Sequence, residues 1–485
     1  MAESKKVTVS KRDVIWNYVG TIASMGSNFL LLPLLLSFLS SAQIGLWYVF
    51  VAISGFAQLL EFGFTSTLSR NILYCLSGAK KLTKQGCDYS SVDGEVDWHL
   101  MRVVLDTSKT IYAVLGLIAL FVAATLGTFY VSYVTDSFLI EGSLPAWIVF
   151  VVSIFTNLYF LYCLTFLRGL GDVAGENRAK TLARIGQLAI TAVLLFCGLS
   201  LLAAALGFLA YSTLLRLFAI RTFRSHHDVE EGIKSDAAAV AKDEMLDVLK
   251  TVSFVAWRDG VVSLAWYGAT QATSLLCSAF LGLEQTGTYS VMLQFATAIH
   301  QISSAYLRSC FPTFQSAYVR DDKQTQKAVV ERGISCYVCM YIVATVLVTA
   351  CLPILTLFKH DFICDPVLFL GIALYYFLLN QHSLFCNIIV SMNEIPYFKA
   401  YLVSTAAGIC VSCVLCGAFS WGAWGLVVGQ AIPQLCYNNW HWPQYVLKRT
   451  GLGYVQAIHS GLDWWKNRMV GQRAKLKHVP LHGDT

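Results

Sequence analysis

Long runs of apolar residues, separated by short polar segments, extend over nearly the whole chain. A hydrophobic stretch of about 20 residues is long enough for an α-helix to cross the hydrocarbon core of a bilayer. Twelve stretches approach or exceed this length, and each predicts a helix: 14–39, 44–66, 109–132, 146–168, 180–200, 201–221, 251–279, 286–310, 333–357, 366–391, 398–419 and 422–446. The first stretch lacks a small-residue cleavage site after a short apolar core, so it predicts a retained helix rather than a signal peptide.

The composition agrees with this pattern. Apolar residues make up 56% of the chain and charged residues 13%, whereas soluble domains contain about 25% charged residues. So few charges cannot cover a water-facing surface, which makes soluble enzymes, nucleic-acid-binding modules and disordered scaffolds poor interpretations. We therefore expect an all-α integral membrane protein with about twelve transmembrane helices.

Lysine and arginine residues predict the orientation, because short cytosolic loops are enriched in them. With both termini inside, every basic residue falls in an inner segment except Lys359, which falls outside, and Arg258, which falls within a helix. The net charge of +6 then lies on the cytosolic face, where anionic headgroups attract it. This distribution gives no indication of nucleic-acid binding, and it predicts a multi-pass protein of the cytoplasmic membrane.

The polar segments divide the chain into four predicted parts. These are an N-terminal six-helix half (1–224), a cytosolic linker (225–250), a C-terminal six-helix half (251–446) and a basic cytosolic tail (447–485). None of the polar segments is long enough for a catalytic domain. The tail contains Trp464, Trp465 and nearby basic residues, which predicts an amphipathic segment on the membrane surface.

The fifteen cysteines do not predict a disulfide framework, because most lie in apolar stretches and only Cys364 falls in an outer loop. Cys410, Cys413 and Cys416 have a spacing that could suit a metal, but no histidine or carboxylate set lies near them. We interpret them as small residues on one helix face. No metal and no other cofactor is predicted.

A weak internal repeat appears when the chain is shifted by half its length. The segment FLSSAQIGLWYVF at 38–50 matches FLGLEQTGTYSVM at 280–292, each spanning a turn between two helices. Six helices per half in the same orientation are parallel repeats, an architecture of transporters that place their substrate between the halves near the bilayer midplane. We therefore expect a central cavity between the two halves.

The same region resembles a known family. Its outer turn contains Gly45 and Trp47, and the next helix ends in Glu61-Phe62-Gly63-Phe64 followed by Arg70. This pattern is similar to the first hairpin of polysaccharide flippases, although that family usually has Asp where this chain has Glu61. The Gly-rich turn WGAWG (421–425) and the twelve-helix layout also resemble the O-antigen flippase branch of the multidrug/oligosaccharidyl-lipid/polysaccharide exporter superfamily.

Polar groups within the predicted helices are the candidate site residues, because each is costly in lipid unless it is solvated or paired. Arg258 falls about 10 Å into its helix and could bind a phosphate through its forked guanidinium. Adjacent Asp259 and Asn380, in another helix, are candidates for the same cavity. The structural alternative is that Arg258 reaches back to the inner interface or neutralises an acid.

Three titratable residues are candidates for ion or proton coupling. Glu61 falls near the inner third of the membrane, where it could couple an ion or form a salt bridge with Arg70. His382 and His300 fall within helices, where a histidine can bind and release protons near neutral pH. For both histidines, a hydrogen-bonded contact between helices is the structural alternative. Pro33 would kink the first helix and is a candidate gating residue.

The resemblance implies a flippase that moves a polyprenyl-diphosphate-linked oligosaccharide to the outer leaflet by alternating access, for surface polysaccharide such as the O-antigen of lipopolysaccharide. Expected partners are that lipid-linked substrate, membrane lipids and the polysaccharide polymerase machinery. No phosphate-binding G-x-x-x-x-G-K-[ST] motif is present, so ATP is not the predicted energy source. A multidrug or metabolite cation antiporter of the same superfamily is one alternative. A membrane-embedded polysaccharide polymerase is another, although every predicted outer loop is short.

Overall fold

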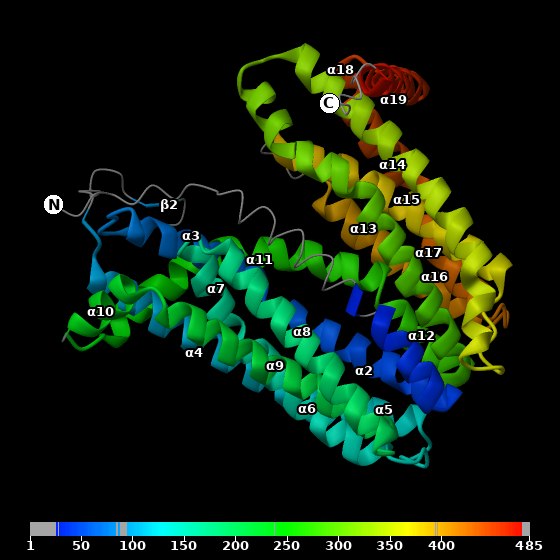
Figure 1. Ribbon diagram of the computed structural model, residues 1–485, viewed down its shortest axis with the longest axis horizontal. Helices are drawn as coiled ribbons and strands as arrows, with labels where there is room; N and C mark the ends of the chain where they lie inside the picture. Colours follow the sequence, from blue (N-terminus) through cyan, green and yellow to red (C-terminus); the bar gives the residue numbers. More distant parts are fainter. Residues whose placement is uncertain are drawn as a thin grey trace, which may run out of the picture. The chain divides into compact units, whose positions relative to one another are not determined.

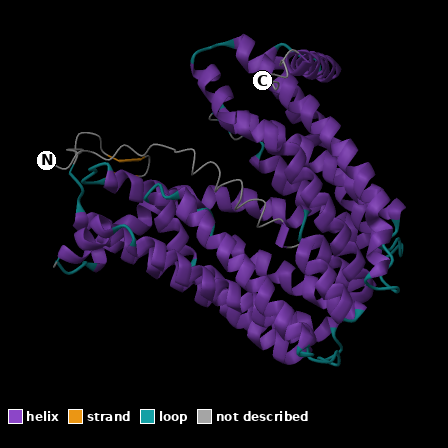
Figure 2. Cartoon of the chain, in the orientation of Figure 1, coloured by secondary structure: helices purple, strands orange, loops and turns teal. Residues whose placement is uncertain are grey.

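The computed structural model describes residues 26–27, 29–83, 86–87, 95–236, 238–392, 394 and 396–477. Side chains are described in these ranges except at 86–87, 254–259, 261–262, 312, 319 and 468–477. Helices make up almost all of this part of the chain (Figure 2). Two short strands, β1 (Leu82–Thr83) and β2 (Gly86–Cys87), form an antiparallel ladder. The predicted all-α architecture is confirmed.

The chain folds into two compact units, Met1–Gly287 and Thr288–Thr485 (Figure 1). The first contains the helix Phe29–Phe38, followed by α2 (Ser41–Leu59), α3 (Phe64–Leu76), α4 (Trp98–Val122), the π-helix η2 (Ala123–Gly127), α5 (Thr128–Val134), α6 (Ser143–Tyr159), α7 (Leu161–Gly169), α8 (Val173–Phe196), α9 (Ser200–Arg224), α10 (His227–Ser235), α11 (Lys242–Ala269) and α12 (Ala272–Leu281). Helix α13 (Leu283–Val319) continues into the second unit. That unit contains α14 (Lys323–Cys351), the 3₁₀-helix η3 (Leu352–Leu357), α15 (Pro366–Ser391), α16 (Phe398–Gly417), α17 (Ala423–Pro433), the π-helix η4 (Gln434–Asn438), α18 (Asn439–Thr450) and α19 (Tyr454–Lys477).

Within the described residues, eight helices are long and apolar enough to cross a membrane. They are Ser41–Leu59, Trp98–Val134, Ser143–Gly169, Val173–Phe196, Ser200–Arg224, Lys323–Leu357, Pro366–Ser391 and Phe398–Gly417. Of the predicted span 14–39, residues 14–25 and 28 lie outside the described residues, and the remainder contains the helix Phe29–Phe38. The other three predicted spans overlap α11–α12, α13 and α17–α18. The two compact units divide within α13, so they do not test the predicted boundaries of the six-helix halves.

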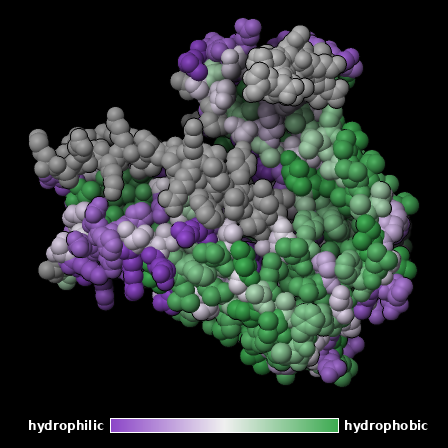
Figure 3. Space-filling model, viewed as in Figure 1, coloured by the Kyte–Doolittle hydropathy of each residue, from purple (hydrophilic) through white to green (hydrophobic). Residues whose placement is uncertain are grey.

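Large apolar side chains cover much of the outer surface of the spanning helices. Phe121, Leu126 and Phe129 in the first unit and Val346 and Leu347 in the second are each more than half exposed. In Figure 3, hydrophobic residues cover the middle of the first unit, and hydrophilic residues gather at its end around α10. Such a surface suits lipid along the helices and water at their ends.

The predicted single helix 44–66 is interrupted in the structure. Helix α2 ends at Leu59, and the turn 60–63 separates it from α3. Phe62 (φ 46°) and Gly63 (φ 77°) both have left-handed backbone conformations, which an α-helix cannot contain and which only glycine adopts readily. The break separates the α2 hydrogen bonds from those of α3 and places Glu61 in the turn.

A π-helical turn interrupts the long helix that begins at Trp98. The segment η2 (Ala123–Gly127) lies between α4 and α5, and π-helical turns occur mostly as single bulges within α-helices. Just after the bulge, Tyr130 donates a hydrogen bond to the carbonyl oxygen of Leu275 at 2.5 Å, and its hydroxyl lies 2.7 Å from that of Ser278. The bulge thus directs a polar side chain of α5 toward α12.

The last two helices of each predicted half pack closely on small residues. In the first unit, Gly207 of α9 faces Thr191 of α8, and a Cβ atom on this glycine would overlap the threonine hydroxyl. In the second unit, Gly429 of α17 faces Ser412 of α16, where a Cβ atom would lie 2.6 Å from both the Cα and the backbone nitrogen of Ser412. Small residues allow membrane helices to approach closely. The equivalent hairpins of the two halves therefore use the same packing solution.

Gln43, in the repeated segment, connects three turns at one end of the first unit. Ser40 and Gln43 form a capping box at the start of α2. The Gln43 side chain also donates to the carbonyl oxygen of Glu141 at 3.0 Å and accepts from the Ser200 hydroxyl at 2.9 Å. Gly45 contacts the backbone of Leu283 so closely that no Cβ atom would fit. The first repeated segment therefore contacts the start of the second at Leu283, within the first unit.

Two polar regions that the sequence predicts as linker and tail contain docked helices. Helix α10 and the start of α11 occupy the linker, and α19 occupies much of the tail. Helix α19 packs against α14: Trp465 donates to the carbonyl oxygen of Arg332 at 3.3 Å, and the Arg332 guanidinium lies 4.2 Å from the Trp464 ring. Protein contacts, rather than the membrane surface alone, hold this tail helix.

The α16–α17 hairpin generates a stability prediction. We expect Gly429→Ala to destabilise the protein, lowering its free energy of unfolding by about 1–3 kcal/mol, the usual cost of overpacking. The obstructing atoms belong to the backbone of Ser412. The thermal unfolding midpoint of the full chain in detergent measures this effect. Gly26→Ala is the matched control, since a Cβ atom there meets nothing within 4 Å. Equal midpoints for the two variants would contradict the close packing.

Candidate functional site

Glu61 lies at the start of a polar network in the first unit. Its carboxylate accepts hydrogen bonds from the backbone N–H of Thr65 and, at 3.4 Å, from the hydroxyl of Tyr112. Among the described residues it makes no ion pair with Arg70, which was the structural alternative for Glu61. The carboxylate is therefore held in the turn by hydrogen-bond donors from α3 and α4.

The network continues from α3 through α4 to α7. The fully buried Tyr112 of α4 has its hydroxyl 2.8 Å from that of Thr65 and 3.2 Å from that of Thr165. Ser69 of α3 donates to the carbonyl oxygen of Thr165 at 3.0 Å. Buried hydroxyl groups that satisfy one another in this way fix the positions of their helices.

One turn further along α7, next to Arg168, lies a buried carboxylate of α8 that binds two cations. Glu176, which is 2% exposed, accepts hydrogen bonds from Arg168 at 2.6 and 2.9 Å and from Lys180 at 2.5 Å. Glu176 and Lys180 belong to α8, and Arg168 belongs to α7. This cluster has one net positive charge.

Arg184 lies further along the same face of α8. Glu176, Lys180, Arg184, Gln187 and Thr191 follow one another at spacings of three or four residues, which places them on one side of an α-helix. Arg184 is eleven residues after the start of the 24-residue helix α8, or about 16 Å along it. Its charge therefore lies near the middle of a candidate membrane span.

The contacts of Arg184 leave its positive charge uncompensated within the described part of the chain. Its guanidinium lies 4.0 Å from the centre of the Tyr211 ring, and one nitrogen donates to the amide oxygen of Gln187 at 2.8 Å. Among the described residues, its buried Nε atom has no hydrogen-bond partner and no carboxylate forms an ion pair with it. An arginine keeps its proton in proteins, so this site suits an anion.

The sequence prediction counted Arg184 among the basic residues of an inner segment, at the start of the predicted span 180–200. In the structure α8 begins earlier, at Val173, and Arg184 lies in the middle of this helix. The signal that could have revealed Arg184 was present in the sequence. It is the recurrence of polar residues every three or four positions from Glu176 to Thr191.

In the second unit, His382 is fully buried in α15. Its Nδ1 lies 3.1 Å from the hydroxyl of Tyr401 in α16, whereas Nε2 has no hydrogen-bond partner among the described residues. Asn380, on the same helix, donates to the carbonyl oxygen of Tyr376 at 2.8 Å. The His382 contact joins two helices, as its structural alternative requires, and leaves one ring nitrogen available.

The other predicted residues make separate contacts in the described part of the structure. His300 of α13 lies 3.5 Å from the hydroxyl of Tyr337 in α14. Pro33 belongs to the helix Phe29–Phe38, and its carbonyl oxygen accepts a hydrogen bond from Ser37. Arg258 and Asp259 belong to α11, but their side chains lie outside the described residues, so their predicted cavity roles stay predictions.

A second buried polar cluster lies near His382. Asn438 of the π-helix η4 donates to Ser404 at 2.8 Å and to Gln434 at 2.7 Å, and it accepts from the Trp442 indole at 2.9 Å. The sequence prediction treated this segment only as part of the last helix and missed the cluster. Among the described residues, no group of three or more His, Cys, Asp and Glu side chains could hold a metal ion.

The fold is that of known transporters. An inward-facing multidrug resistance MATE family transporter of the MOP superfamily superposes with a TM-score of 0.66 at 14% identity, covering 91% of this chain and 99% of that one. An outward-facing MATE transporter gives 0.56 at 12% identity, with coverages of 93% and 98%. A mutant of the Vibrio cholerae MATE transporter VcmN gives 0.56 at 14% identity, with coverages of 90% and 97%.

Sequence comparisons give no closer assignment. No protein-family model matches the chain, and no curated protein matches it. At identities of 12% to 14%, the structural likeness establishes a shared fold and leaves the substrate open. The chain therefore has the fold of the MATE transporters of the MOP superfamily.

The Glu176 cluster generates a prediction about stability. Replacing Glu176 with Gln removes the only carboxylate that pairs with Arg168 and Lys180 among the described residues, while these two cations stay partly exposed at 46% and 30%. A hydrogen bond to a charged group contributes about 1.5–3 kcal/mol, so we expect a lowered thermal midpoint in detergent. Glu230→Gln, which breaks the exposed pair of Glu230 with Lys234, is the control and should leave the midpoint nearly unchanged. A similar midpoint for both variants would show that Glu176 is not structurally important.

Proposed function

We propose that this protein is a membrane transporter that flips an anionic lipid-linked oligosaccharide, a polyprenyl diphosphate sugar, across the cytoplasmic membrane by alternating access. Both termini face the cytosol in this proposal. The fold supports the transporter part, because proteins of this fold have been captured in inward-facing and outward-facing conformations. The lipid-linked substrate rests on the resemblance of the 40–70 segment to polysaccharide flippases and on the charge of the membrane-depth residues.

The observation that best supports an anionic substrate is Arg184. A guanidinium in the middle of a membrane helix is costly unless it is paired or hydrated, and Arg184 has no carboxylate partner among the described residues. Its forked donors match the oxygens of a diphosphate. In the proposed cycle, the α8–α9 hairpin exposes Arg184 to the substrate path in at least one state, where the diphosphate replaces water around the guanidinium.

The charge balance distinguishes this proposal from a cation antiporter of the same fold. In the described part of the first unit, Arg168, Lys180 and Arg184 lie within the helices that form the candidate spans of α7 and α8. The acids at this depth are Glu176, which two of those cations bind, and Glu61 in the α2–α3 turn. An organic cation would meet a net positive surface there. Glu61 is the residue that would favour the antiporter if it faced the substrate.

A membrane-embedded polymerase is a weaker alternative. Such an enzyme would be expected to have a large outer loop for its acceptor and donor. The connection between α5 and α6, the longest predicted outer loop, contains only the residues between Val134 and Ser143. The fold likeness is to transporters as well, which supports a non-enzymatic role.

Arg184 generates the first functional prediction. In a host strain that lacks the gene, Arg184→Ala should lower export of surface polysaccharide at least about tenfold, equivalent to 1.4 kcal/mol, and lipid-linked sugar should accumulate on the cytosolic side. Arg184→Lys should restore export only partly, because an ammonium group lacks the guanidinium fork.

Arg216→Ala is the matched control for this experiment. Arg216 lies in the neighbouring helix α9, is exposed, and places its guanidinium 4.6 Å from the Phe160 ring. Its variant should export normally at normal protein level. Normal export by Arg184→Ala as well would remove the anion-binding role and favour the cation antiporter.

Glu61 and His382 generate a second prediction, which concerns energy coupling. If a proton gradient drives transport through either residue, Glu61→Gln or His382→Ala should abolish the dependence of transport on the pH gradient while the protein level stays normal. Transport into vesicles with imposed gradients measures this dependence. Glu394→Gln, at a partly exposed carboxylate that pairs with Arg449, is a control. If both site variants keep the wild-type dependence, their hydrogen bonds with Tyr112 and Tyr401 have structural roles only.

A further inference from the structure

The segment that connects the two predicted halves is folded onto the start of α4. The 37-residue helix Trp98–Val134 is about 55 Å long, whereas the hydrocarbon core is about 30 Å thick. Its first turns therefore project beyond the membrane. Helix α10, residues 236 and 238–241, and the first turns of α11 pack against this projecting end.

Apolar contacts provide the base of this interface. Gly232 of α10 lies so close to the Trp98 ring that a Cβ atom would be 2.5 Å from it. Val229, Ile233, Val240 and Met245 pack against the buried cluster that includes residues of α4. These contacts do not change with pH, so they set a constant part of the docking energy.

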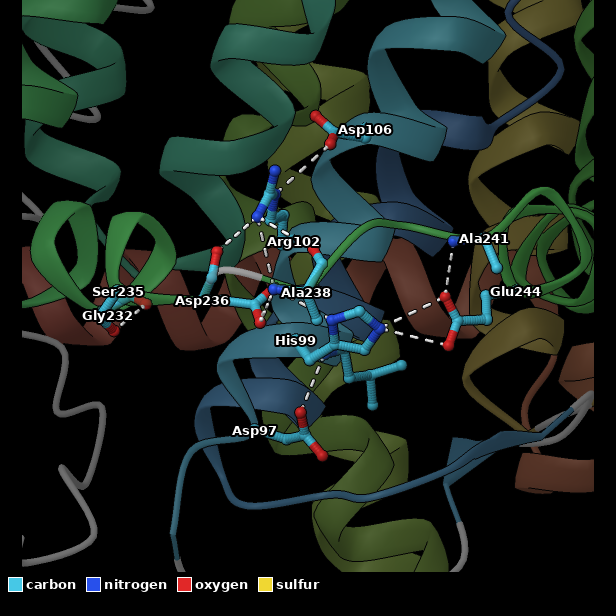
Figure 4. Close-up of polar contacts among 11 residues, drawn as sticks. Asp97, His99, Arg102, Asp106, Gly232, Ser235, Asp236, Ala238, Ala241 and Glu244 are labelled. Atoms are coloured by element: carbon cyan, nitrogen blue, oxygen red, sulfur yellow. Dashed lines mark hydrogen bonds and ion pairs between the residues drawn. The ribbon is translucent and has the colours of Figure 1, made fainter.

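A histidine lies at the polar centre of the interface (Figure 4). The ring of His99 lies between two carboxylates of the linker: Nδ1 is 3.0 Å from Asp236, and Nε2 is 3.2 Å from Glu244. A neutral imidazole can donate at only one nitrogen, whereas the imidazolium donates at both. The observed geometry therefore fits the charged ring, which joins two acids that would otherwise repel each other.

The remaining charged groups around His99 lie on the start of α4 and on the linker. Arg102 donates to the carbonyl oxygens of Asp236 at 2.5 Å and Ala238 at 3.3 Å, and lies 3.6 Å from the Asp236 carboxylate. Arg102 also approaches Asp106, which pairs with Lys109, while Asp97 caps the start of α4. From the linker side, Lys234 pairs with Glu230 on α10, and Lys242 and Asp243 begin α11. His99 is the group in this cluster whose charge changes near neutral pH.

We propose that His99 is a positioning residue: its charged ring holds the linker on α4, and loss of that charge releases the linker and eases exchange between inward-facing and outward-facing states. The structural part of this proposal stands on the contacts of the first unit. The effect on exchange rests on the proposed transport function.

The direction of the pH dependence follows from the two carboxylates. Hydrogen bonds to Asp236 and then Glu244, together with their charge, raise the pKa of His99 above its ordinary value of 6.5. A raised pKa in the docked state means that the contribution of His99 is complete below pH 6.5 and is lost as the pH rises through the raised value. Docking should therefore weaken from neutral to alkaline pH.

Hydrogen exchange of the full chain in lipid nanodiscs tests the structural part without any substrate. After correction for intrinsic exchange, protection of residues 238–246 should fall at least about fivefold from pH 6 to pH 9. This corresponds to about 1 kcal/mol. His99→Gln should show weak protection at both pH values, and Glu244→Gln should move the transition to lower pH because one carboxylate is lost.

The control and the contrary outcomes are specific. His226 pairs with Asp172 at 2.9 Å at the other end of α10, so His226→Gln should keep the wild-type pH profile at 238–246. A wild-type profile in His99→Gln, or equal protection of the native linker at pH 6 and pH 9, would overturn the proposal. If exchange behaves as expected but the transport rate of His99→Gln matches the wild type at every pH, the link to state exchange is wrong. Absence of transport in the wild type would instead contradict the proposed function.

Discussion

The need to satisfy every backbone polar group away from water determines most of this structure. In hydrocarbon an unpaired N–H or C=O costs several kcal/mol, so a spanning segment must close its hydrogen bonds internally, and a helix does so. The interruptions of the spanning helices are therefore informative. The turn 60–63 occurs where Thr65 donates its N–H to Glu61 and where Tyr112 and Thr165 supply hydroxyl groups. The chain leaves the helical path there because protein side chains replace the missing partners.

The same constraint applies with greater force to charges. Glu176 is almost completely buried and is surrounded by Arg168 and Lys180, whereas Arg184 has only an amide oxygen and an aromatic ring as partners among the described residues. The two arrangements differ in how their charges are satisfied. A carboxylate with two cations is satisfied within the protein and locks α7 to α8, while a cation with unused donors is stable only if water or a ligand reaches it. In the proposed function, the residue that the fold leaves incompletely satisfied is the one that binds the substrate.

Sequence patterns predicted the number and position of the helices well, because a hydrophobic stretch of fixed length is a direct consequence of bilayer thickness. The prediction 366–391 coincides with α15 (Pro366–Ser391), and the boundary predicted between the spans 180–200 and 201–221 lies close to a turn at Gly198. Local breaks were harder to predict. The turn at Gly63 lies within an apolar run, and its conformation depends on tertiary partners from α4 and α7. Arg184 was missed as a candidate because hydropathy averages over a window, so a helix with a polar face appears to begin later than it does. Residues such as Gln43 and His99 act through partners about 100 residues or more away in sequence, and no local pattern reports them.

The π-helical turn η2 affects how the sequence of this chain would align with that of a relative. Such a turn contains one residue more than the α-helical turn it replaces, and one residue corresponds to about 100° of rotation around a helix. The extra residue in Ala123–Gly127 therefore decides which face of α5 meets α12, and with it whether Tyr130 reaches Leu275 and Ser278. A relative without this insertion would present different residues to α12 from an otherwise similar sequence. A correct alignment of the two would need a gap in the middle of a membrane helix, where gaps are usually penalised. Sequence comparison can therefore miss a relationship between two chains that share the same fold.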